Sequence, residues 1–390
     1  MKILFVLKKY NDLTAQNALC VKGIVKILNN RHKIDVLTLE NSGENNNNTC
    51  VHQINVNNEF CFYEKIKFAF TFPIHKKVEK LFLKKAEELL KVFKYDVIIS
   101  VENPIEAVSS ITKLKKKFNF KHIIYEIDPA SNKYKNPENI LEKIWKKRSR
   151  RLEKNFYKNA DYIYHMESHK KYFSDIFYAC FNYKSSYLDI PYIDDSFYFS
   201  SINDYTLSKT KLKFIYAGSF YKKIREPYIP FNILNEVLKK TESKIYIYTN
   251  KLFLDILKKS YDNNFFVVDD MIPNDILKRR MADSDILVSI GNKNSDFLPS
   301  KTIQYISTGK PIIHFVFDEN DTSISYYKKY KNALIIDCNN DICKNIENIS
   351  SFISKKIHGI TFSSIKNIYY KNTFEYTAYE IERKINDLQK

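Results

Sequence analysis

Continuous apolar runs alternate with helical stripes along this chain. Residues 2–7 form the first run, and residues 15–29 follow with apolar side chains at spacings of three and four. A second run at residues 33–39 completes a strand–helix–strand unit. Such a unit is typical of a parallel sheet, because the chain must cross back through a helix before the next strand begins. The pattern therefore predicts an α/β fold.

The alternation continues to residue 190. We expect further strands at residues 95–101, 121–127, 161–165 and 186–190, and helices at residues 76–94, 104–118, 138–159 and 168–177. The polar stretch 41–49, which contains four consecutive asparagines, is expected to be an exposed loop tip.

Residues 192–210 are polar and aromatic without a clear period, and we place a domain boundary there. The alternation then restarts, with strands expected at residues 213–217, 244–248, 265–268, 285–290, 311–317 and 333–337, and helices at residues 229–240, 252–260, 275–281 and 301–308. Continuous Val/Ile/Leu runs indicate strands that are buried on both faces. The fold class is therefore α/β, with two Rossmann-like parallel-sheet domains, 1–192 and 193–365, that face a cleft. The tail, residues 341–390, has an amphipathic helical pattern.

The net charge of +18 narrows the choice of partners. It suits nucleic acid, an anionic membrane surface or phosphate-bearing substrates. No zinc-finger, RRM or homeodomain pattern is present, so we do not expect nucleic acid as a partner. At 390 residues, with 44% hydrophobic residues, the chain is long enough for two domains with real cores.

The six cysteines, at positions 20, 50, 61, 180, 338 and 343, form no CxxC pair. Their spacing fits neither a zinc site nor a disulfide framework, so we expect free thiols in a reducing cytoplasm and no metal site. No apolar stretch reaches the roughly 20 residues of a membrane span, so any membrane contact is expected at the surface only.

The first candidate binding segment follows the expected strand 213–217. Gly218 and Ser219 end this strand, and a glycine there lets the backbone approach a ligand closely. Cations follow within seven residues of Gly218, among them Lys223 and Arg225. These residues suit a diphosphate, and they also fit a tight turn with solvated basic residues.

The second segment lies between the expected strands 285–290 and 311–317. Ser300 is expected to be the N-cap of a helix that starts at Lys301, and Gly309 occupies the position of a helix C′ residue. A helix N-terminus offers N–H groups and a positive dipole end to a phosphate, and Lys301 adds a full charge. Gln304 lies one turn further on the same face. An ordinary capped crossover helix explains Ser300 and Gly309 but neither Lys301 nor Gln304.

This second segment resembles the donor-site signature of the large retaining family of GT-B-fold glycosyltransferases. Many bacterial members carry a stretch like "PSKxxEYxxxGKPII", which stands here as residues 299–313, PSKTIQYISTGKPII. The "ADSDILV" at residues 282–288 and the "YAGS" at residues 216–219 are similar to the family's approach to this site. The "AD" at residues 160–161 and the Ile190-Pro191 pair extend the resemblance, loosely, to the N-terminal half.

The resemblance implies a GT-B architecture and roles for individual residues. Asp296 and Gln304 stand where the family has two glutamates, one facing the transferred sugar and the other binding the ribose. Backbone from Leu298 through Pro299 and Ser300 to Lys301 would hold the diphosphate, with Lys223 or Arg225 after the first strand. The replaced glutamates and Ser219, where the family often has arginine, leave the nucleotide open. In this architecture the C-terminal helix, residues 366–390, returns to the N-terminal domain.

The N-terminal half is expected to bind the acceptor. Polar residues stand at its strand ends, namely Glu102, Asn103, Glu126, Asp128, His165 and Glu167. The segment 125–129, YEIDP, resembles the family's "DxxDP" strand end, and Asp128 would then orient an acceptor hydroxyl or the sugar. A cap or a salt bridge explains Asp128 equally well, and a satisfied core histidine explains His165.

A dense run of cations lies on the expected helix 138–159. Residues 143–158 include Trp145 and Leu152 beside many lysines and arginines. This run suits an anionic membrane surface, and hence a lipid-linked acceptor, but it also fits a solvated helix face.

The sequence thus predicts a cytoplasmic glycosyltransferase, peripheral at the inner membrane face through residues 143–158. It would transfer a sugar from a nucleotide sugar to a glycan or lipid-linked acceptor in surface polysaccharide biosynthesis, with retention and without a metal or other cofactor. A sugar-nucleotide epimerase of the same fold and a non-catalytic partner subunit that keeps the donor fold are the alternatives.

Overall fold

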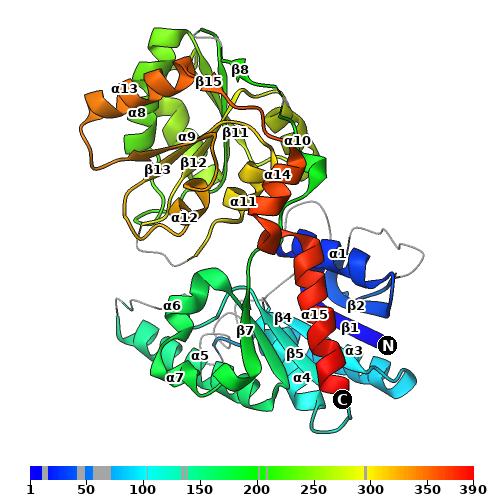
Figure 1. The fold of residues 1–390 in the computed structure, drawn as a ribbon. Coiled ribbons are helices and arrows are strands. Elements are labelled where there is room, and N and C mark those ends of the chain that lie inside the picture. The colour runs from blue at the N-terminus through cyan, green and yellow to red at the C-terminus, as the bar shows by residue number, and fades with distance from the viewer. Residues whose placement is uncertain are drawn as a thin grey trace. The chain divides into compact units, whose positions relative to one another are not determined.

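The computed structural model describes residues 1–10, 16–41, 49–55, 72–102, 104–132, 137, 139–200, 203–207, 210–293 and 297–390. The chain divides into two compact units (Figure 1). Unit 1 consists of Met1–Asp189 and Phe374–Lys390, and unit 2 is Ile190–Thr373. The sequence-based division placed these borders at residues 192 and 366.

Unit 1 is built on one seven-stranded parallel sheet with the order β3-β2-β1-β4-β5-β6-β7. Its strands are β1 (Lys2–Tyr10), β2 (Lys33–Asn41), β3 (Thr49–Gln53), β4 (Val97–Glu102), β5 (Lys121–Glu126), β6 (Tyr162–Met166) and β7 (Ser185–Leu188). Every residue of β4 is buried, as expected for a central strand covered on both faces. β3 was not predicted: Thr49 begins this strand, whereas residues 42–48 of the expected loop tip lie outside the described residues.

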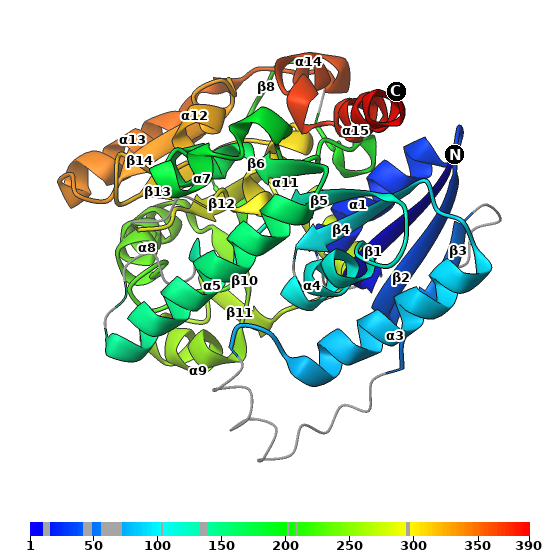
Figure 2. The same ribbon diagram turned by 90° about the horizontal axis from the view of Figure 1, so that it is seen from below.

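Helices cover both faces of the unit 1 sheet. They are α1 (Gln16–Leu28), α3 (Lys76–Val92), α4 (Ile105–Leu114), α5 (Ile140–Asn159), α6 (Lys170–Phe173), α7 (Ile176–Ala179) and α15 (Phe374–Gln389), with short 3₁₀ turns η2 (Glu167–His169) and η3 (Asn182–Lys184). α3, α4 and α5 lie on one face, and α1 lies with α15 on the other (Figure 2). The single helix expected at residues 168–177 is wrong: Asp175 adopts ψ 135° and caps α7 by accepting from the Phe177 N–H, so the helix breaks there.

The C-terminal helix α15 belongs to unit 1, where it packs closely against α1. Gly23 lies on α1, and a Cβ there would come within 2.4 Å of the Phe374 ring. Polar contacts add to this packing. Arg31 donates to one oxygen of the Glu382 carboxylate at 2.8 Å, and His32 Nε2 lies 3.0 Å from the other. The Tyr164 hydroxyl donates to the Glu380 carbonyl at 2.7 Å.

Unit 2 is a six-stranded parallel sheet with the order β11-β10-β9-β12-β13-β14. Its strands are β9 (Lys213–Ala217), β10 (Lys244–Thr249), β11 (Phe266–Asp270), β12 (Ile286–Ile290), β13 (Ile312–Val316) and β14 (Ala333–Asp337). This is the doubly wound strand order. Successive strands are added on one side of β9 and then on the other side from β12, so the strand order reverses between these two neighbours. Ligands of such sheets bind beyond the carboxyl ends of the strands at that reversal.

The helices of unit 2 are α8 (Tyr228–Thr241), α9 (Lys251–Ser260), α10 (Asn274–Ala282), α11 (Ser300–Ser307), α12 (Ile324–Tyr327), α13 (Ile342–Ser354) and α14 (Phe362–Ile368). A two-stranded antiparallel sheet, β8 (Tyr205–Thr206) with β15 (Lys356–Ile357), and the turns η4 (Asp195–Phe197) and η5 (Tyr370–Asn372) complete it. α8 and α13 pack together over one face, with apolar residues of both in the same core cluster. The prediction of two Rossmann-like parallel-sheet domains is confirmed.

A Gly23→Ala substitution tests how α15 is held. The added Cβ meets a rigid ring at 2.4 Å, and such overpacking typically costs about 1–3 kcal/mol. We expect faster hydrogen exchange over Phe374–Gln389, with the exchange of unit 2 unchanged. Gly359→Ala is the matched control, because this glycine lies in unit 2 and its φ is not in the left-handed region. Equal exchange in both variants would show that Gly23 does not determine the docking of α15.

Candidate functional site

The turn after β9 holds a cation against the backbone. Gly218 follows the last residue of β9, and a Cβ there would lie 3.2 Å from the Tyr216 hydroxyl and 3.8 Å from Arg225 Nη1. Arg225 donates from Nε to Asn292 Oδ1 at 3.0 Å and from Nη1 to the Ser219 carbonyl at 3.4 Å. Its guanidinium therefore links the loop after β9 to the loop after β12, at the reversal of the sheet.

Lys223 lies apart from this arrangement. It is exposed at the tip of a turn that closes between Tyr221 and Arg225, and its φ is +65°. Such a left-handed conformation costs a non-glycine residue roughly 1–2 kcal/mol. The Lys223 N–H donates to Glu226 Oε1 at 3.1 Å. Of the two cations named in the sequence-based site, the fold thus places Arg225 beside Gly218 and Lys223 on the outside of the turn.

Helix α11 begins one residue earlier than predicted. Ser300 is its first residue, Pro299 occupies the N-cap position with φ −61°, and no side chain caps the helix. The prediction of Ser300 as N-cap is therefore wrong, because the fixed φ of proline already sets the entry geometry and the serine lies within the helix. Gly309, with φ +75°, follows the C-cap residue Thr308 as predicted.

Lys301 and Gln304 form a pair on the first turn of α11. Lys301 Nζ donates to Gln304 Oε1 at 2.6 Å. Gln304 is fully buried, and its Nε2 has no hydrogen-bond partner among the described residues. Lys301 is partly exposed as a residue, but its ammonium is buried, and this burial lowers the pKa of Lys301 to about 8. An unpaired buried amide donor costs about 1–3 kcal/mol unless a ligand satisfies it.

Contacts from both sides fix the position of α11. The Ala217 N–H, at the end of β9, donates to the Tyr305 hydroxyl at 3.0 Å. Thr302 and Ser323 share a hydroxyl–hydroxyl hydrogen bond of 3.0 Å that ties α11 to the segment before α12. The N-terminal turn of α11 and the Gly218 turn are therefore held at the same edge of the sheet, whereas Asp296, the candidate catalytic residue before α11, lies outside the described residues.

A buried polar chain under this edge was not predicted. Ser289 Oγ contacts His314 Nδ1 at 3.0 Å, and His314 Nε2 lies 3.3 Å from Asp321 Oδ2. Burial raises the pKa of Asp321, but the contacts with His314 and the Ser323 N–H outweigh it, and the pKa is lowered overall. Asp321 lies so close to Gly291 that a Cβ there would be 1.7 Å from its carboxylate. These three polar side chains fix the loop after β12, and they come from three segments with no sequence motif in common.

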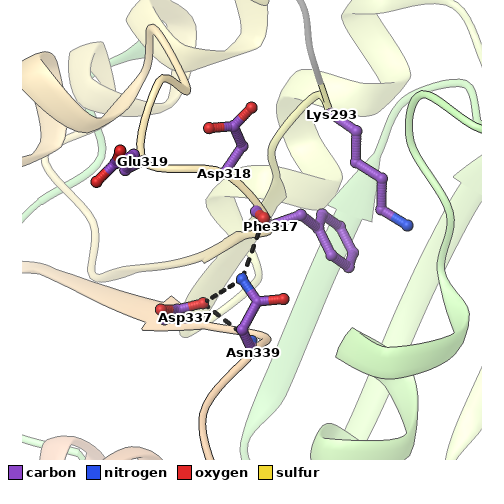
Figure 3. Close-up of a pocket in the computed structure, with 6 residues that line it drawn as sticks. All are labelled: Lys293, Phe317, Asp318, Glu319, Asp337 and Asn339. Atoms are coloured by element: carbon purple, nitrogen blue, oxygen red, sulfur yellow. Dashed lines mark hydrogen bonds between the residues drawn. The ribbon is translucent and has the colours of Figure 1, made fainter.

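A pocket of about 410 Å³ opens at the carboxyl ends of β13 and β14 (Figure 3). It is lined by Lys293, Phe317, Asp318, Glu319, Asp337 and Asn339. Lys293 Nζ lies 4.5 Å from the centre of the Phe317 ring, and Asn339 Nδ2 donates to the Phe317 carbonyl at 3.1 Å. Carboxylates and an amide beside an aromatic ring suit a ligand rich in hydroxyl groups better than a second phosphate. The sequence analysis did not identify this pocket.

In unit 1, the predicted acceptor residues separate into buried and exposed groups. Glu102, Glu126 and His165 are buried, whereas Asp128 and Glu167 are exposed. Asn103 lies outside the described residues. Asp128 stands on the loop that follows β5, so the fold leaves it accessible, and its role as a candidate catalytic residue stays a prediction.

The buried residues meet a third carboxyl group, Glu153 of α5. Oxygens of Glu102, Glu126 and Glu153 all lie within 4.8 Å of one another. Glu126 is bonded by the Tyr157 hydroxyl and by His165 Nδ1. Its burial and that of Glu102, together with the nearby carboxyl groups, raise the pKa of both well above their usual range, and burial lowers the pKa of His165 to about 3. Three such carboxyl groups cannot all be ionised, so they share protons.

This carboxyl cluster holds the loop that carries Asp128. The Ser131 N–H and hydroxyl donate to the two oxygens of Glu153 at 2.7 and 2.5 Å, and the Ala130 N–H donates to Glu102 Oε1 at 3.3 Å. Protein donors thus bond oxygens of Glu126 and Glu153, whereas Oε2 of Glu102 has no hydrogen-bond partner among the described residues. Glu153 recurs with Ser149, Phe156 and Tyr157 on the buried stripe of α5, a helical spacing that the sequence already contains.

The fold therefore brings together side chains that could bind a metal ion, although their spacing in the sequence does not indicate it. Besides the carboxyl cluster, Asp35, Cys50 and His52 come together on β2 and β3. Asp35 accepts from the Tyr95 hydroxyl at 2.5 Å and pairs with Lys2 at 3.2 Å, so it already has charged and neutral partners. The expectation of a metal-independent protein stays a prediction.

Several solved structures share this architecture. A sucrose-phosphate synthase from Thermosynechococcus elongatus is 11% identical with a TM-score of 0.68, over 100% of this chain and 99% of that one. WaaG, a glycosyltransferase involved in lipopolysaccharide biosynthesis, is 12% identical with a TM-score of 0.58, over 96% and 98%. A UDP-N-acetylglucosamine 2-epimerase is 10% identical with a TM-score of 0.50, over 95% and 94%.

These likenesses show the fold alone. Neither a protein-family model nor a curated protein sequence matches the chain. The two parallel-sheet units match the GT-B architecture of the glycosyltransferases among these structures. What the chain does must be argued from its own site.

A Glu102→Gln substitution tests the carboxyl cluster. Since the folded-state pKa of Glu102 is raised, its contribution to stability is full at low pH and is lost as pH rises from its ordinary value of 4.5 through the folded-state pKa. The amide keeps a donor for Glu126 but does not titrate. We expect the melting temperature of the variant to fall less than that of the wild type as pH rises, and Glu88→Gln, an exposed change on α3, to follow the wild type. Identical profiles for all three proteins would contradict the shared-proton account.

Proposed function

We propose that this chain is a glycosyltransferase that transfers a sugar from a nucleotide-sugar donor to a glycan or lipid-linked acceptor. The observation that carries the proposal is the first turn of α11. There the buried ammonium of Lys301 and the Nε2 of Gln304, which has no hydrogen-bond partner among the described residues, stand at the reversal of a doubly wound sheet. An anion with hydrogen-bonding oxygens next to it satisfies both groups, and a nucleoside diphosphate has this chemistry.

In this proposal the diphosphate binds between the Gly218 turn and α11. Arg225 and the main chain of Leu298, Pro299, Ser300 and Lys301 neutralise and bind its oxygens, and Gly218 and Ser219 let the strand end approach it. Gln304 binds the ribose. Asp296 faces the transferred sugar, whose hydroxyl groups the carboxylate-lined pocket beside β13 and β14 suits.

The chemistry requires a good leaving group and an oriented acceptor. The bond between the anomeric carbon and the diphosphate oxygen breaks while the acceptor oxygen forms its bond to the same carbon, and the acceptor proton passes to the departing diphosphate oxygen. Fixed cations and helix N–H groups stabilise the departing charge without reorganising. Asp128, exposed after β5 on a loop held by the carboxyl cluster, orients the acceptor hydroxyl. Retention of configuration and a place in surface polysaccharide biosynthesis rest on the family resemblance.

An epimerase is the second candidate, because a UDP-N-acetylglucosamine 2-epimerase shares the fold. It would use the same donor site without an acceptor, so turnover of a nucleotide sugar in the absence of acceptor separates the two enzymes. A non-catalytic partner subunit is the third, because Gln304 stands where the resemblance places a glutamate. Such a subunit would bind a nucleotide without turning it over.

Substitutions in the first turn of α11 test the donor site. Lys301→Ala removes a charge-assisted contact worth about 1.5–3 kcal/mol, so we expect roughly 10–100-fold weaker binding of the tightest ligand among UDP-, GDP-, ADP-, CDP- and TDP-sugars. Gln304→Ala removes a neutral contact, and a smaller loss of about 2–10-fold is expected. Calorimetric titration measures both.

The matched control is Lys258→Ala, an exposed lysine on α9 of the same unit. Its affinity should equal that of the wild type. A wild-type protein that binds none of the five nucleotide sugars would overturn the proposed function, and wild-type affinity in both α11 variants would remove the site from this helix.

We also propose that unit 1 contacts an anionic membrane surface through α5. The N-terminal half of this helix, residues 140–148, has no buried residue, and Ile140, Leu141 and Ile144 are 73%, 58% and 44% exposed. A groove of about 350 Å³ follows, lined by Pro137, Lys143, Lys146, Lys147, Arg150, Arg151, Lys154 and Phe177. Exposed apolar residues on the same helix as a cationic groove match an anionic headgroup layer. None of the described helices is long and apolar enough to cross a membrane.

Charge reversal on α5 tests this contact. Each cation near an anionic surface contributes about 1 kcal/mol, so Lys147→Glu with Arg151→Glu should weaken co-sedimentation with phosphatidylglycerol vesicles at least about tenfold. Lys258→Glu with Lys259→Glu, an equal charge change on α9, should leave it nearly unchanged. Equal binding of the wild type to neutral and anionic vesicles would contradict a membrane role for α5.

A further inference from the structure

Among the residues that the structure describes, no carboxylate pairs with Lys301. Its ammonium is buried and donates to the neutral amide of Gln304 at 2.6 Å. Because an ammonium can only donate, the atom of Gln304 that faces it is the carbonyl oxygen, and this settles the orientation of the amide. The Nε2 group is then the unpartnered donor. Both groups therefore need a negatively charged or hydrogen-bond-accepting partner from outside the described residues.

The described titratable groups of the neighbouring elements do not supply this charge. Arg225, from the turn after β9, is another cation and bonds Asn292 and Ser219. Asp321, before α12, accepts from the Ser323 N–H at 2.8 Å and faces His314 of β13. The hydroxyls of Tyr216, Tyr305 and Tyr327 are buried, and burial raises the pKa of each, so they stay neutral. Burial alone accounts for the lowered pKa of Lys301.

We propose that the diphosphate of the donor is itself the counter-ion of Lys301, that its binding is coupled to proton uptake by this lysine, and that Gln304 creates the coupling by leaving the ammonium unpaired. The inference rests on the proposed function and deepens it. A glutamate at position 304 would pair with Lys301 and keep it charged whether or not a ligand is present. With glutamine, the lysine loses its proton readily in the free site and regains it when the anion arrives.

The sign of the pH dependence follows. A bound anion favours the charged lysine and raises its pKa above the free-site value of about 8. Affinity is therefore full below that value and declines above it, because the free protein must first take up a proton. Between about pH 7 and about pH 9 the charged fraction of the free site falls about tenfold, and the affinity should fall by the same factor.

The experiment uses the full chain and whichever of ADP, CDP, GDP, TDP and UDP binds it most tightly. Calorimetric titrations at a series of pH values between about 7 and 9, in two buffers with different heats of ionisation, give both the affinity and the protons taken up. Melting curves at each pH show that the protein remains folded. Lys301→Arg is the key variant, since arginine stays charged throughout, and any titration of the nucleotide itself appears equally in both proteins.

The wild type should show the tenfold decline with proton uptake, and Lys301→Arg should show neither. Gln304→Glu should bind several-fold more weakly at about pH 7, because its carboxylate cancels the site charge, and its decline should move to higher pH. A wild-type affinity that does not change with pH, or a decline that persists in Lys301→Arg or stays in place in Gln304→Glu, would overturn the coupling while the proposed function stands. Failure of all five nucleotides to bind at any pH would overturn both.

Discussion

In a parallel sheet every strand ends at the same edge, and the chain must cross a face of the sheet before it can start the next strand. Both units of this protein obey that constraint. In unit 2 the crossovers run one way from β9 and the other way from β12, so the loops after these two neighbouring strands diverge. Gly218 and Arg225 come from one loop, and α11 follows the other. The Tyr305–Ala217 hydrogen bond, 3.0 Å long, fixes the helix to that edge.

The two units differ in how they accommodate buried ionisable side chains. In unit 1, Glu102, Glu126 and Glu153 lie together, and their raised pKa values reflect protons that they share. Groups of the protein bond both oxygens of Glu153 and both of Glu126, and the Ala130 N–H bonds one oxygen of Glu102. In unit 2, Lys301 is buried against an amide, and an amide cannot balance its charge. One arrangement holds a loop in place, and we propose that a bound anion completes the other.

The amino-acid sequence predicted the alternating elements well, because buried parallel strands are continuous apolar runs and amphipathic helices have a strong period. β3 escaped, since its five residues follow an Asn-rich stretch, and the helix at 168–177 was expected whole because its apolar period continues across the capping Asp175. In the site, Lys301, Gln304 and Gly218 stood out from their positions at strand and helix ends. The Ser289–His314–Asp321 chain did not, since its members come from three segments that only the fold brings together.

The central claim is that the first turn of α11 is an anion site completed by a nucleoside diphosphate. A crystal structure of the chain grown with its tightest-binding nucleoside diphosphate tests this claim most directly. The account predicts phosphate oxygens within hydrogen-bond distance of Lys301 Nζ and the Arg225 guanidinium, with a nucleotide oxygen accepting from Gln304 Nε2. A nucleotide bound away from α11, with Gln304 Nε2 still unpartnered and Lys301 still turned to its amide, would contradict it.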